Sequence, residues 1–232
     1  MTEQAGLGKR NESRTGSMAE RIPPEKGDAT MEKRNDTIMK LTQTALMAAL
    51  CYVSFTYLQI KIPVGGDATS IHIGNAFCVL AALLLGGGYG GMAGAIGMTI
   101  GDLLDPVYVT TAPKTFVLKL CIGLITGLVA HRIAHISESK DKKYALKWSI
   151  LASVAGLGFN VIADPLVGYF YNRYLLGQPR ELADVLTKWG SATTFINAVI
   201  STILVAAVYN VLRPALNRSG LAVHVGTRKK AA

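Results

Sequence analysis

Charged and amide side chains occur inside long apolar stretches of this sequence, and they are the residues best placed to do chemistry. Lys119 lies within FVLKLCIGLITGLVAHRIAHI, while Asn160 and Asp164 lie within WSILASVAGLGFNVIADPLVGYFY. Residues four apart share one face of a helix, so this amide and this carboxylate point the same way. A charge inside an apolar helix is costly and by default indicates a functional site. Ammonium, amide and carboxylate groups together suit hydrogen bonding to a polar small molecule.

Further polar candidates lie at the ends of the apolar stretches. His72 and Asn75 occur in IHIGN, Asn197 occurs in TTFINAVISTILVAAVYNVL, and Asp102 closes a glycine-rich run. A solvated helix end is an equally simple interpretation for Asp102 and for Asp105. Lys114, just before the apolar stretch that begins at Phe116, can also extend its ammonium to the membrane surface.

The elements that must position these residues are membrane helices. The chain is 50% hydrophobic and 17% charged, whereas soluble domains carry about 25% charged residues. A spanning helix needs about 20 mainly apolar residues. The stretches that approach or exceed this length are Thr42–Ile62, Ile71–Leu104, Phe116–Ile136, Trp148–Tyr171 and Thr193–Leu212.

The stretch Ile71–Leu104 contains the glycine cluster GGGYGG at Gly86–Gly91, which raises the question of one helix or two. Basic loops stay in the cytoplasm. A single helix would place the basic segment 132–147 outside, whereas a turn at the glycines places this segment and both basic chain ends inside. We therefore predict an all-α integral membrane protein, a six-transmembrane-helix bundle with cytoplasmic N and C termini. The expected outer connections are residues 63–74, 105–115 and 172–191.

Three parts are expected along the chain. Residues 1–36 are polar and lack apolar periodicity, which predicts a disordered N-terminal extension, with Met31 as a natural start of the membrane protein. Residues 37–217 form the six-helix membrane domain, and residues 218–232 form a basic cytoplasmic tail. The net charge of +9 collects beside apolar segments, as in cytoplasmic flanks, so we expect no nucleic-acid partner.

The predicted topology places the polar candidates together in the outer half of the membrane. Unpaired amides and charges cannot face lipid, so a polar pocket opening outward between the helices accounts for them. The loop around Gly65, Gly66 and Asp67 is expected to close over this pocket. The predicted substrate-binding residues are His72, Asn75, Asp102, Tyr108, Lys114, Lys119, Asn160, Asp164 and Asn197.

Motifs that do not occur narrow the function further. The sequence has no G-x-x-x-x-G-K-[ST], so no Walker-type ATP site of its own is expected, and it has neither H-E-x-x-H nor G-x-S-x-G. Its three cysteines, all inside apolar segments, form neither a disulfide framework nor a zinc site. We predict no enzyme activity, catalytic residue, metal or cofactor. Two alternatives stay open: an intramembrane enzyme using Asp102, Asp105 and His72 on a lipid-linked substrate, and a stand-alone carrier.

An ordered string of motifs resembles a known family. It reads ALMAA in the first apolar segment, then IHIGNAFCVLAALLLGGGYGGMAGAIG, GDLL and APKTFVLKLCIGLITGLVA. From about Lys40 to Leu216 the chain is similar to the substrate-binding S component of an energy-coupling factor (ECF) transporter of the riboflavin-type branch. The resemblance implies a multi-pass subunit of the cell membrane. It also implies an ECF module as partner: a transmembrane coupling protein and two cytoplasmic ATPases, which consume the ATP.

The resemblance further implies an importer for a vitamin or related water-soluble compound. Riboflavin, pantothenate, a pyridoxine-like compound, a pyrimidine precursor and a queuosine-type base all remain open as ligands. Family members contact the coupling protein through A-x-x-x-A on the first helix, and Ala45 and Ala49 stand at that spacing here, with Ala48 beside them. Small residues four apart allow close helix approach, so packing within the bundle is the alternative interpretation of this strip.

Overall fold

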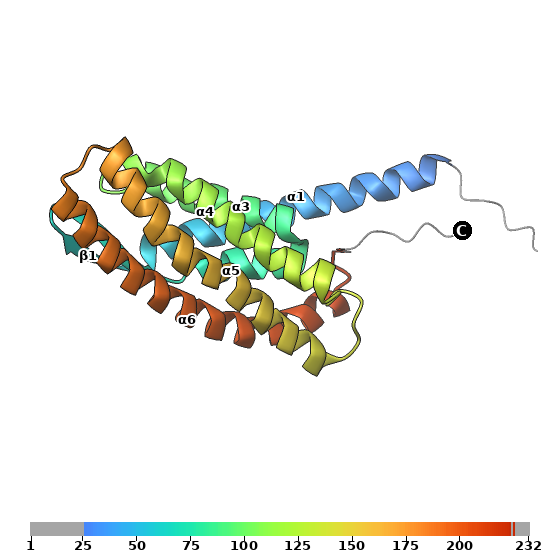
Figure 1. Ribbon diagram of the computed structural model, residues 1–232. Helices are drawn as coiled ribbons and strands as arrows, with labels where there is room; N and C mark the ends of the chain where they lie inside the picture. The colour runs from blue at the N-terminus through green and yellow to red at the C-terminus, as the bar shows by residue number, and fades with distance from the viewer. Residues whose placement is uncertain (1–25, 224, 226–232) are drawn as a thin grey trace, which may run out of the picture.

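The computed structural model of this protein describes residues 26–223 and residue 225 (Figure 1). The described chain forms a bundle of six α-helices with one β-hairpin at one end and the start of α1 projecting beyond the other. The elements are α1 (Lys26–Tyr57), β1 (Gln59–Val64), β2 (Asp67–His72), α2 (Gly74–Leu85), α3 (Gly87–Leu103), η1 (Val109–Thr111), α4 (Ala112–Gly127), η2 (Leu128–Ile133), α5 (Lys142–Phe170), η3 (Tyr171–Leu175) and α6 (Arg180–Arg218).

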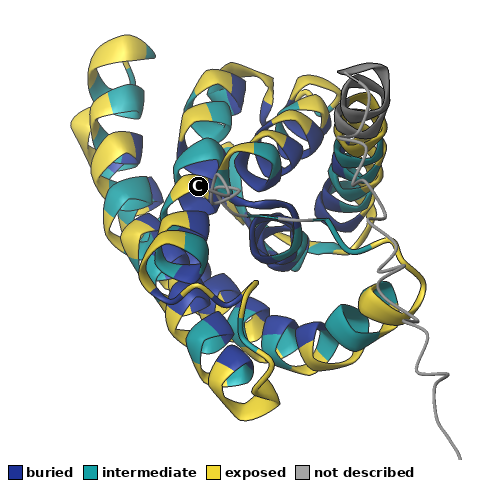
Figure 2. Cartoon of the chain, turned by 90° about the vertical axis from the view of Figure 1, so that its right-hand side faces the viewer, coloured by how far each residue is buried: buried dark blue, intermediate teal, exposed yellow. Residues whose placement is uncertain are grey.

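Helix α2 lies at the centre of this bundle. Ten of its 12 residues are buried, and the end-on view in Figure 2 shows a dark blue helix ringed by the others. It packs against all five of the other α-helices. Its sequence, GNAFCVLAALLL, explains this position, because a helix that is apolar on every side must be enclosed on every side.

Helix α3 packs closely against three neighbours through glycine pairs spaced four residues apart. A Cβ added at Gly90 or Gly94 would overlap α2 at Ala82 or Cys78. At Gly97 and Gly101 it would overlap α1, and at Gly91 it would meet the Leu120 carbonyl of α4 at 2.8 Å. Helix α4 also contributes glycines to this contact, because a Cβ at Gly123 or Gly127 would overlap the backbone of α3. These faces let helix backbones touch, which is the usual mode of close packing in membranes.

The predicted break in Ile71–Leu104 is confirmed as a break between two helices. It falls at Gly86 alone, whose φ of 93° favours glycine, and the glycines from Gly87 onward belong to α3. At 1.5 Å per residue, α2 is about 18 Å long and α3 about 26 Å long, both shorter than a hydrocarbon core of about 30 Å.

Within the described residues, four helical segments are long and apolar enough to cross a membrane on their own. They are Arg34–Tyr57, Val109–Ile133, Lys142–Leu175 and Arg180–Arg218.

The first connection differs from the prediction. We expected the first helix to run to Ile62, but it ends at Tyr57, and the chain then forms the antiparallel hairpin β1–β2. Gly65 and Gly66, with φ of 61° and 91°, occupy the two-residue turn between Val64 and Asp67. Positive φ at both central residues is the requirement of a type I′ hairpin turn, which explains the Gly-Gly pair.

Two further boundaries also differ. Helix α1 begins at Lys26, so part of the segment 1–36 that we expected to be disordered is helical; residues 1–25 lie outside the described residues. The outer connection expected at 172–191 is far shorter, since η3 continues α5 to Leu175 and α6 begins at Arg180. The first residues of α6, RELADVLTK, include charged side chains, so a search for apolar stretches does not recognise them as part of the helix.

The glycine contacts predict unequal effects of alanine at two positions. Gly123→Ala should lower the free energy of unfolding by about 1–3 kcal/mol, because its methyl group overlaps the backbone of α3. Gly88→Ala should not lower it, since nothing lies within 4 Å of the added Cβ. Thermal unfolding of both variants in one detergent tests this, and equal melting temperatures would contradict the packing described here.

Candidate functional site

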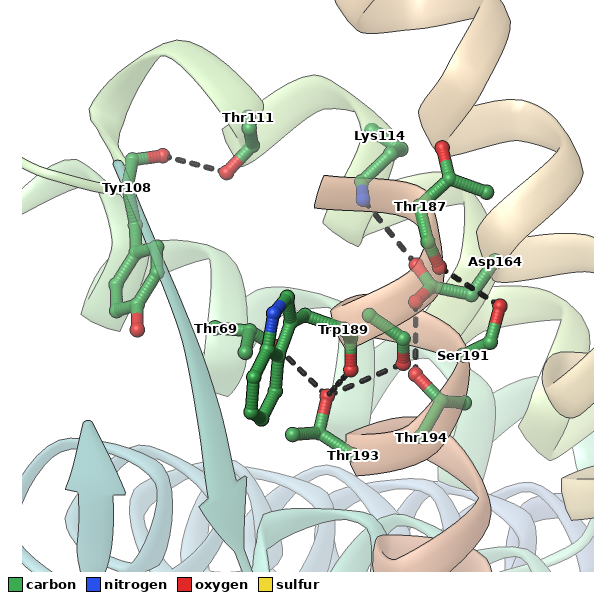
Figure 3. Close-up of polar contacts among 11 residues, drawn as sticks. Thr69, Tyr108, Thr111, Lys114, Asp164, Thr187, Trp189, Ser191, Thr193 and Thr194 are labelled. Carbon is green, nitrogen blue, oxygen red and sulfur yellow. Dashed lines mark hydrogen bonds and ion pairs between the residues drawn. The ribbon is translucent and has the colours of Figure 1, made fainter. Parts of the chain in front are cut away.

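Asp164 of α5 is the centre of a polar cluster between three helices. Its carboxylate accepts a hydrogen bond from Lys114 Nζ of α4 at 3.2 Å and another from Thr194 Oγ1 of α6 at 2.9 Å. Figure 3 shows these two side chains approaching Asp164 from different elements. The side chains of the ion pair are only 18% and 20% exposed. A charge-assisted contact this sheltered holds α4, α5 and α6 at a defined separation.

Lys119 is buried near this ion pair but does not join it. Its residue is 8% exposed, and within the described residues its ammonium has no hydrogen bond and no carboxylate within 4 Å. It interacts electrostatically with the carboxylates of Asp164 and Asp102 and with the Lys114 ammonium. A buried ammonium is stable only when its donors are satisfied, so its three N–H groups are suited to a bound polar molecule.

Three more predicted site residues are almost fully buried polar groups. Asn75 lies in the first turn of α2, Asn160 lies one turn before Asp164, and Asp102 lies in the last turn of α3, each 2% exposed. One side-chain oxygen of each is buried without a hydrogen-bond partner of good geometry, although Thr115 lies near Asp102. Such atoms are rare in native structures because burial without a partner is costly, and each of these oxygens could accept a hydrogen bond from a bound molecule.

The predicted site residues His72 and Asn197 meet at the hairpin. The Asn197 side-chain oxygen accepts from the His72 backbone N–H at 2.9 Å, and its Nδ2 donates to the Ser70 carbonyl at 3.0 Å. One turn earlier, the Thr193 and Thr69 hydroxyls are 2.7 Å apart. We call Thr193 and Asn197 the α6 clasp. Asn197 of the clasp thus hydrogen-bonds to the backbone N–H of His72 and the backbone carbonyl of Ser70 on the edge of β2 that faces away from β1. Both ends of its amide are therefore already bound to the hairpin.

Tyr108 packs between α1 and the hairpin. It packs beside Phe55 of α1, and the Lys61 ammonium of β1 lies 5.3 Å from the centre of its ring. Lys61 also forms an ion pair with Asp105, which ties β1 to the loop after α3. At the turn, Gln178 Nε2 donates to Asp67 at 3.4 Å. The hairpin is therefore held by contacts to the loop after α3, to the segment before α6 and to α6 itself.

The structure thus brings together part of the predicted site. Lys114 and Asp164 are in contact, with Lys119 and Asp102 in their electrostatic field, and His72 also interacts with Lys119 and Asp164. Tyr108 and Asn197 contact the hairpin instead. Ala45, Ala48 and Ala49 lie away from this cluster on α1.

The comparisons with known proteins give one result. Residues 35–214 match the family model described as "ECF-type riboflavin transporter, S component". The chain belongs to this family. No curated protein and no solved structure matches the chain. The protein is therefore a multi-pass membrane protein and a substrate-specific subunit of an ECF transporter, from a family of transporter subunits and not of enzymes.

Sequence reasoning missed several residues of this S component. Thr194 supports Asp164, and Thr69, Ser70 and Thr193 complete the contact between β2 and α6. The four-residue spacing of Thr193 and Asn197 was visible and marks one helix face. Nothing in the sequence indicates that Thr194 contacts Asp164, because that contact depends on how α5 and α6 pack.

The alanine strip of this S component divides between two faces of α1. Ala45 and Ala49 are exposed. Ala48 is half-buried, and its carbonyl faces Gly97 of α3. Within the described residues, therefore, only Ala48 of the three takes part in internal packing with that glycine.

The α6 clasp predicts a local effect of Asn197→Ala. Removing the amide leaves the Ser70 carbonyl and the His72 N–H unsatisfied, at about 1–3 kcal/mol each, so the hairpin should open more often. Hydrogen–deuterium exchange of residues 59–72 should rise several-fold, while α3 and α4 stay protected. Thr202→Ala is the control, because its hydroxyl bonds only to Ala198 of its own helix. Unchanged exchange of the hairpin in the Asn197 variant would show that the clasp does not hold it.

Proposed function

We propose that this chain is the binding subunit of an ATP-driven importer for a vitamin or related small water-soluble compound. The observation that carries the proposal is Lys119, a buried ammonium without a direct protein partner among the described residues, in a chain of the S component family. Asn75 and Asn160 add buried amides without partners for their oxygens. The β-hairpin is the natural cover of such a site, held by contacts that binding and release can make and break.

The charges around the site favour a ligand of no net charge. Two ammonium groups, Lys114 and Lys119, face two carboxylates, Asp102 and Asp164, within one electrostatic group. A ligand with an unbalanced charge would leave an uncompensated charge in a region of low dielectric constant, which is costly. A neutral or zwitterionic molecule with several hydrogen-bond donors and acceptors fits best. This chemistry leaves riboflavin and several other vitamin-like compounds open.

The proposed topology has six spans with both termini in the cytoplasm. The end of the bundle opposite the hairpin carries Arg132, Lys140, Lys142, Lys143 and Lys147, as expected of a cytoplasmic end. The hairpin and the polar cluster then lie at the outer end, where a ligand enters. Helices α2 and α3 are short for spans, but α2 is enclosed by protein and does not need to match the bilayer thickness.

An intramembrane enzyme is supported less well by the geometry. That hypothesis requires Asp102, Asp105 and His72 to act together, yet Asp105 is paired with Lys61 of the hairpin. The His72 backbone is bound to Asn197, and its ring packs edge-on against Phe55 with centroids 4.9 Å apart. The part of the chain that the structure describes holds no group of three His, Cys, Asp or Glu side chains placed to bind a metal.

The binding site predicts that Lys119→Met and Asn160→Ala each weaken ligand binding. A hydrogen bond involving a charged group is worth about 1.5–3 kcal/mol, and a buried polar group left without its partner costs about 1–3 kcal/mol, so dissociation constants should rise about tenfold to a hundredfold. The ligand is first identified by mass spectrometry of small molecules that co-purify with the subunit, and riboflavin, pantothenate and pyridoxine are tested directly. Calorimetry on the purified variants then gives the affinities.

Lys143→Gln is the matched control, since Lys143 is an exposed lysine at the opposite end of the bundle. Its affinity should equal that of the unaltered protein. If the Lys119→Met and Asn160→Ala variants both bind the ligand as tightly as the unaltered protein, the proposed site is wrong. If the subunit binds no small molecule of this kind, the proposed function is wrong.

The partner proposed for the exposed alanines is the coupling protein of an ECF module, whose two ATPases would supply the energy. Ala45 and Ala49 form a strip of small residues that faces outward, next to the exposed Leu46. Small-residue strips associate with other helices by close backbone approach.

This interface predicts that Ala45→Trp and Ala49→Trp separate transport from binding. The bulky ring prevents a partner helix from approaching, so uptake by cells that express the whole transporter should be lost, while the isolated subunit keeps its affinity. Ala207→Trp, at an exposed alanine of α6, is the control and should retain uptake. Loss of ligand binding in the α1 variants would mean that the strip packs within the bundle instead.

A further inference from the structure

A basic cavity lies at the end of the bundle opposite the hairpin. It measures about 400 Å³ and lies between the start of α5 and the end of α6. Lys140, Lys142 and Arg213 line it together with one carboxylate, Glu138. The cavity therefore carries more positive than negative charge, and it is separate from the polar cluster around Asp164.

The three cations of this cavity are not neutralised by the chain. Within the described residues, none of them has a carboxylate within 4 Å. Arg213 is held in place, because its Nη2 donates to the carbonyls of Ile136 at 2.6 Å and Ser139 at 2.9 Å. Its other guanidinium nitrogens make no hydrogen bond to the described chain, and a guanidinium with free donors suits the oxygens of a phosphate group.

The residues around the cavity are of the kinds found at a membrane surface. The long apolar run of α6 ends at Leu212, directly before Arg213, and α5 begins at Lys142. Tyr144 and Trp148, with ring centroids 6.1 Å apart, follow on α5, and such aromatic residues concentrate at membrane surfaces. Leu146 and Pro214 give the cavity an apolar wall beside its charged wall.

We propose that this cavity binds the phosphodiester headgroup of an anionic membrane lipid, with Lys140, Lys142 and Arg213 around the phosphate and the glycerol part against Leu146 and Pro214. Clusters of basic residues at a membrane surface attract anionic lipids, and basic pockets between helices bind their headgroups. The apolar wall favours a lipid over a free phosphate ion. This site goes beyond the proposed transport function, and it uses none of the residues assigned to the transported ligand.

The test is native mass spectrometry of the full chain in detergent with added phosphatidylglycerol or phosphatidylcholine. We expect specific adducts of phosphatidylglycerol that persist at lipid concentrations where phosphatidylcholine adducts are lost. The double variant Lys140→Gln/Lys142→Gln should bind phosphatidylglycerol about thirtyfold more weakly, from the typical contribution of a lysine at a membrane surface. Arg213 is left unchanged because it also holds the carbonyls of Ile136 and Ser139.

The matched control is Lys143→Gln/Lys147→Gln, which removes two exposed lysines of α5 that lie outside the cavity. Retention of phosphatidylglycerol by this control and its loss from the cavity variant supports the site. An equal loss from both would show attraction by overall charge and would overturn the proposal. Equal binding of phosphatidylcholine, or full displacement of phosphatidylglycerol by millimolar inorganic phosphate, would also overturn it.

Discussion

The enclosure of α2 is the constraint on which the rest of the structure depends. This helix is apolar on every side and only 12 residues long, so the other helices must surround it. Lipid is as apolar as a leucine side chain, and the hydrophobic effect therefore adds little to packing within the membrane. Close contact supplies the attraction instead. The glycines of α3 let it approach α1, α2 and α4 together, because each pair faces a different neighbour.

The position of α2 also links the hairpin to the polar residue Asn75. Strand β2 ends at His72, α2 begins at Gly74, and Asn75 follows in the first turn. Any movement of the hairpin therefore acts directly on the first turn of the central helix. The α6 clasp holds this junction through the Asn197 side chain, and the Lys61–Asp105 ion pair holds β1. The polar contacts of the structure thus gather at the hairpin, whereas the rest of the bundle is held by apolar and glycine packing.

The sequence predicted the apolar segments, the break at the glycines and the family, because these depend on local composition and order. It also contained the signal of the hairpin, since Gly65-Gly66 between the strand-like runs QIKIPV and DATSIH favours a two-residue turn. A count of apolar residues alone does not detect this signal. The contact of Thr194 with Asp164 could not be predicted from the sequence, because it depends on the relative rotation of two helices. For the same reason the sequence could name Lys114 and Asp164 but could not pair them.

Some small residues of this chain lie at contacts between its helices, whereas others lie on its exposed surface. Each glycine pair of α3 has its Cβ position filled by a neighbouring helix, so these glycines are explained by the fold itself. The backbone carbonyl of Ala48 faces Gly97, so this part of α1 lies at an internal contact. Ala45 and Ala49 have the same four-residue spacing but face outward. A strip of small side chains facing lipid forgoes the contact area that leucine or phenylalanine would provide. The bundle does not require small residues there, whereas a helix of another subunit lying against α1 would.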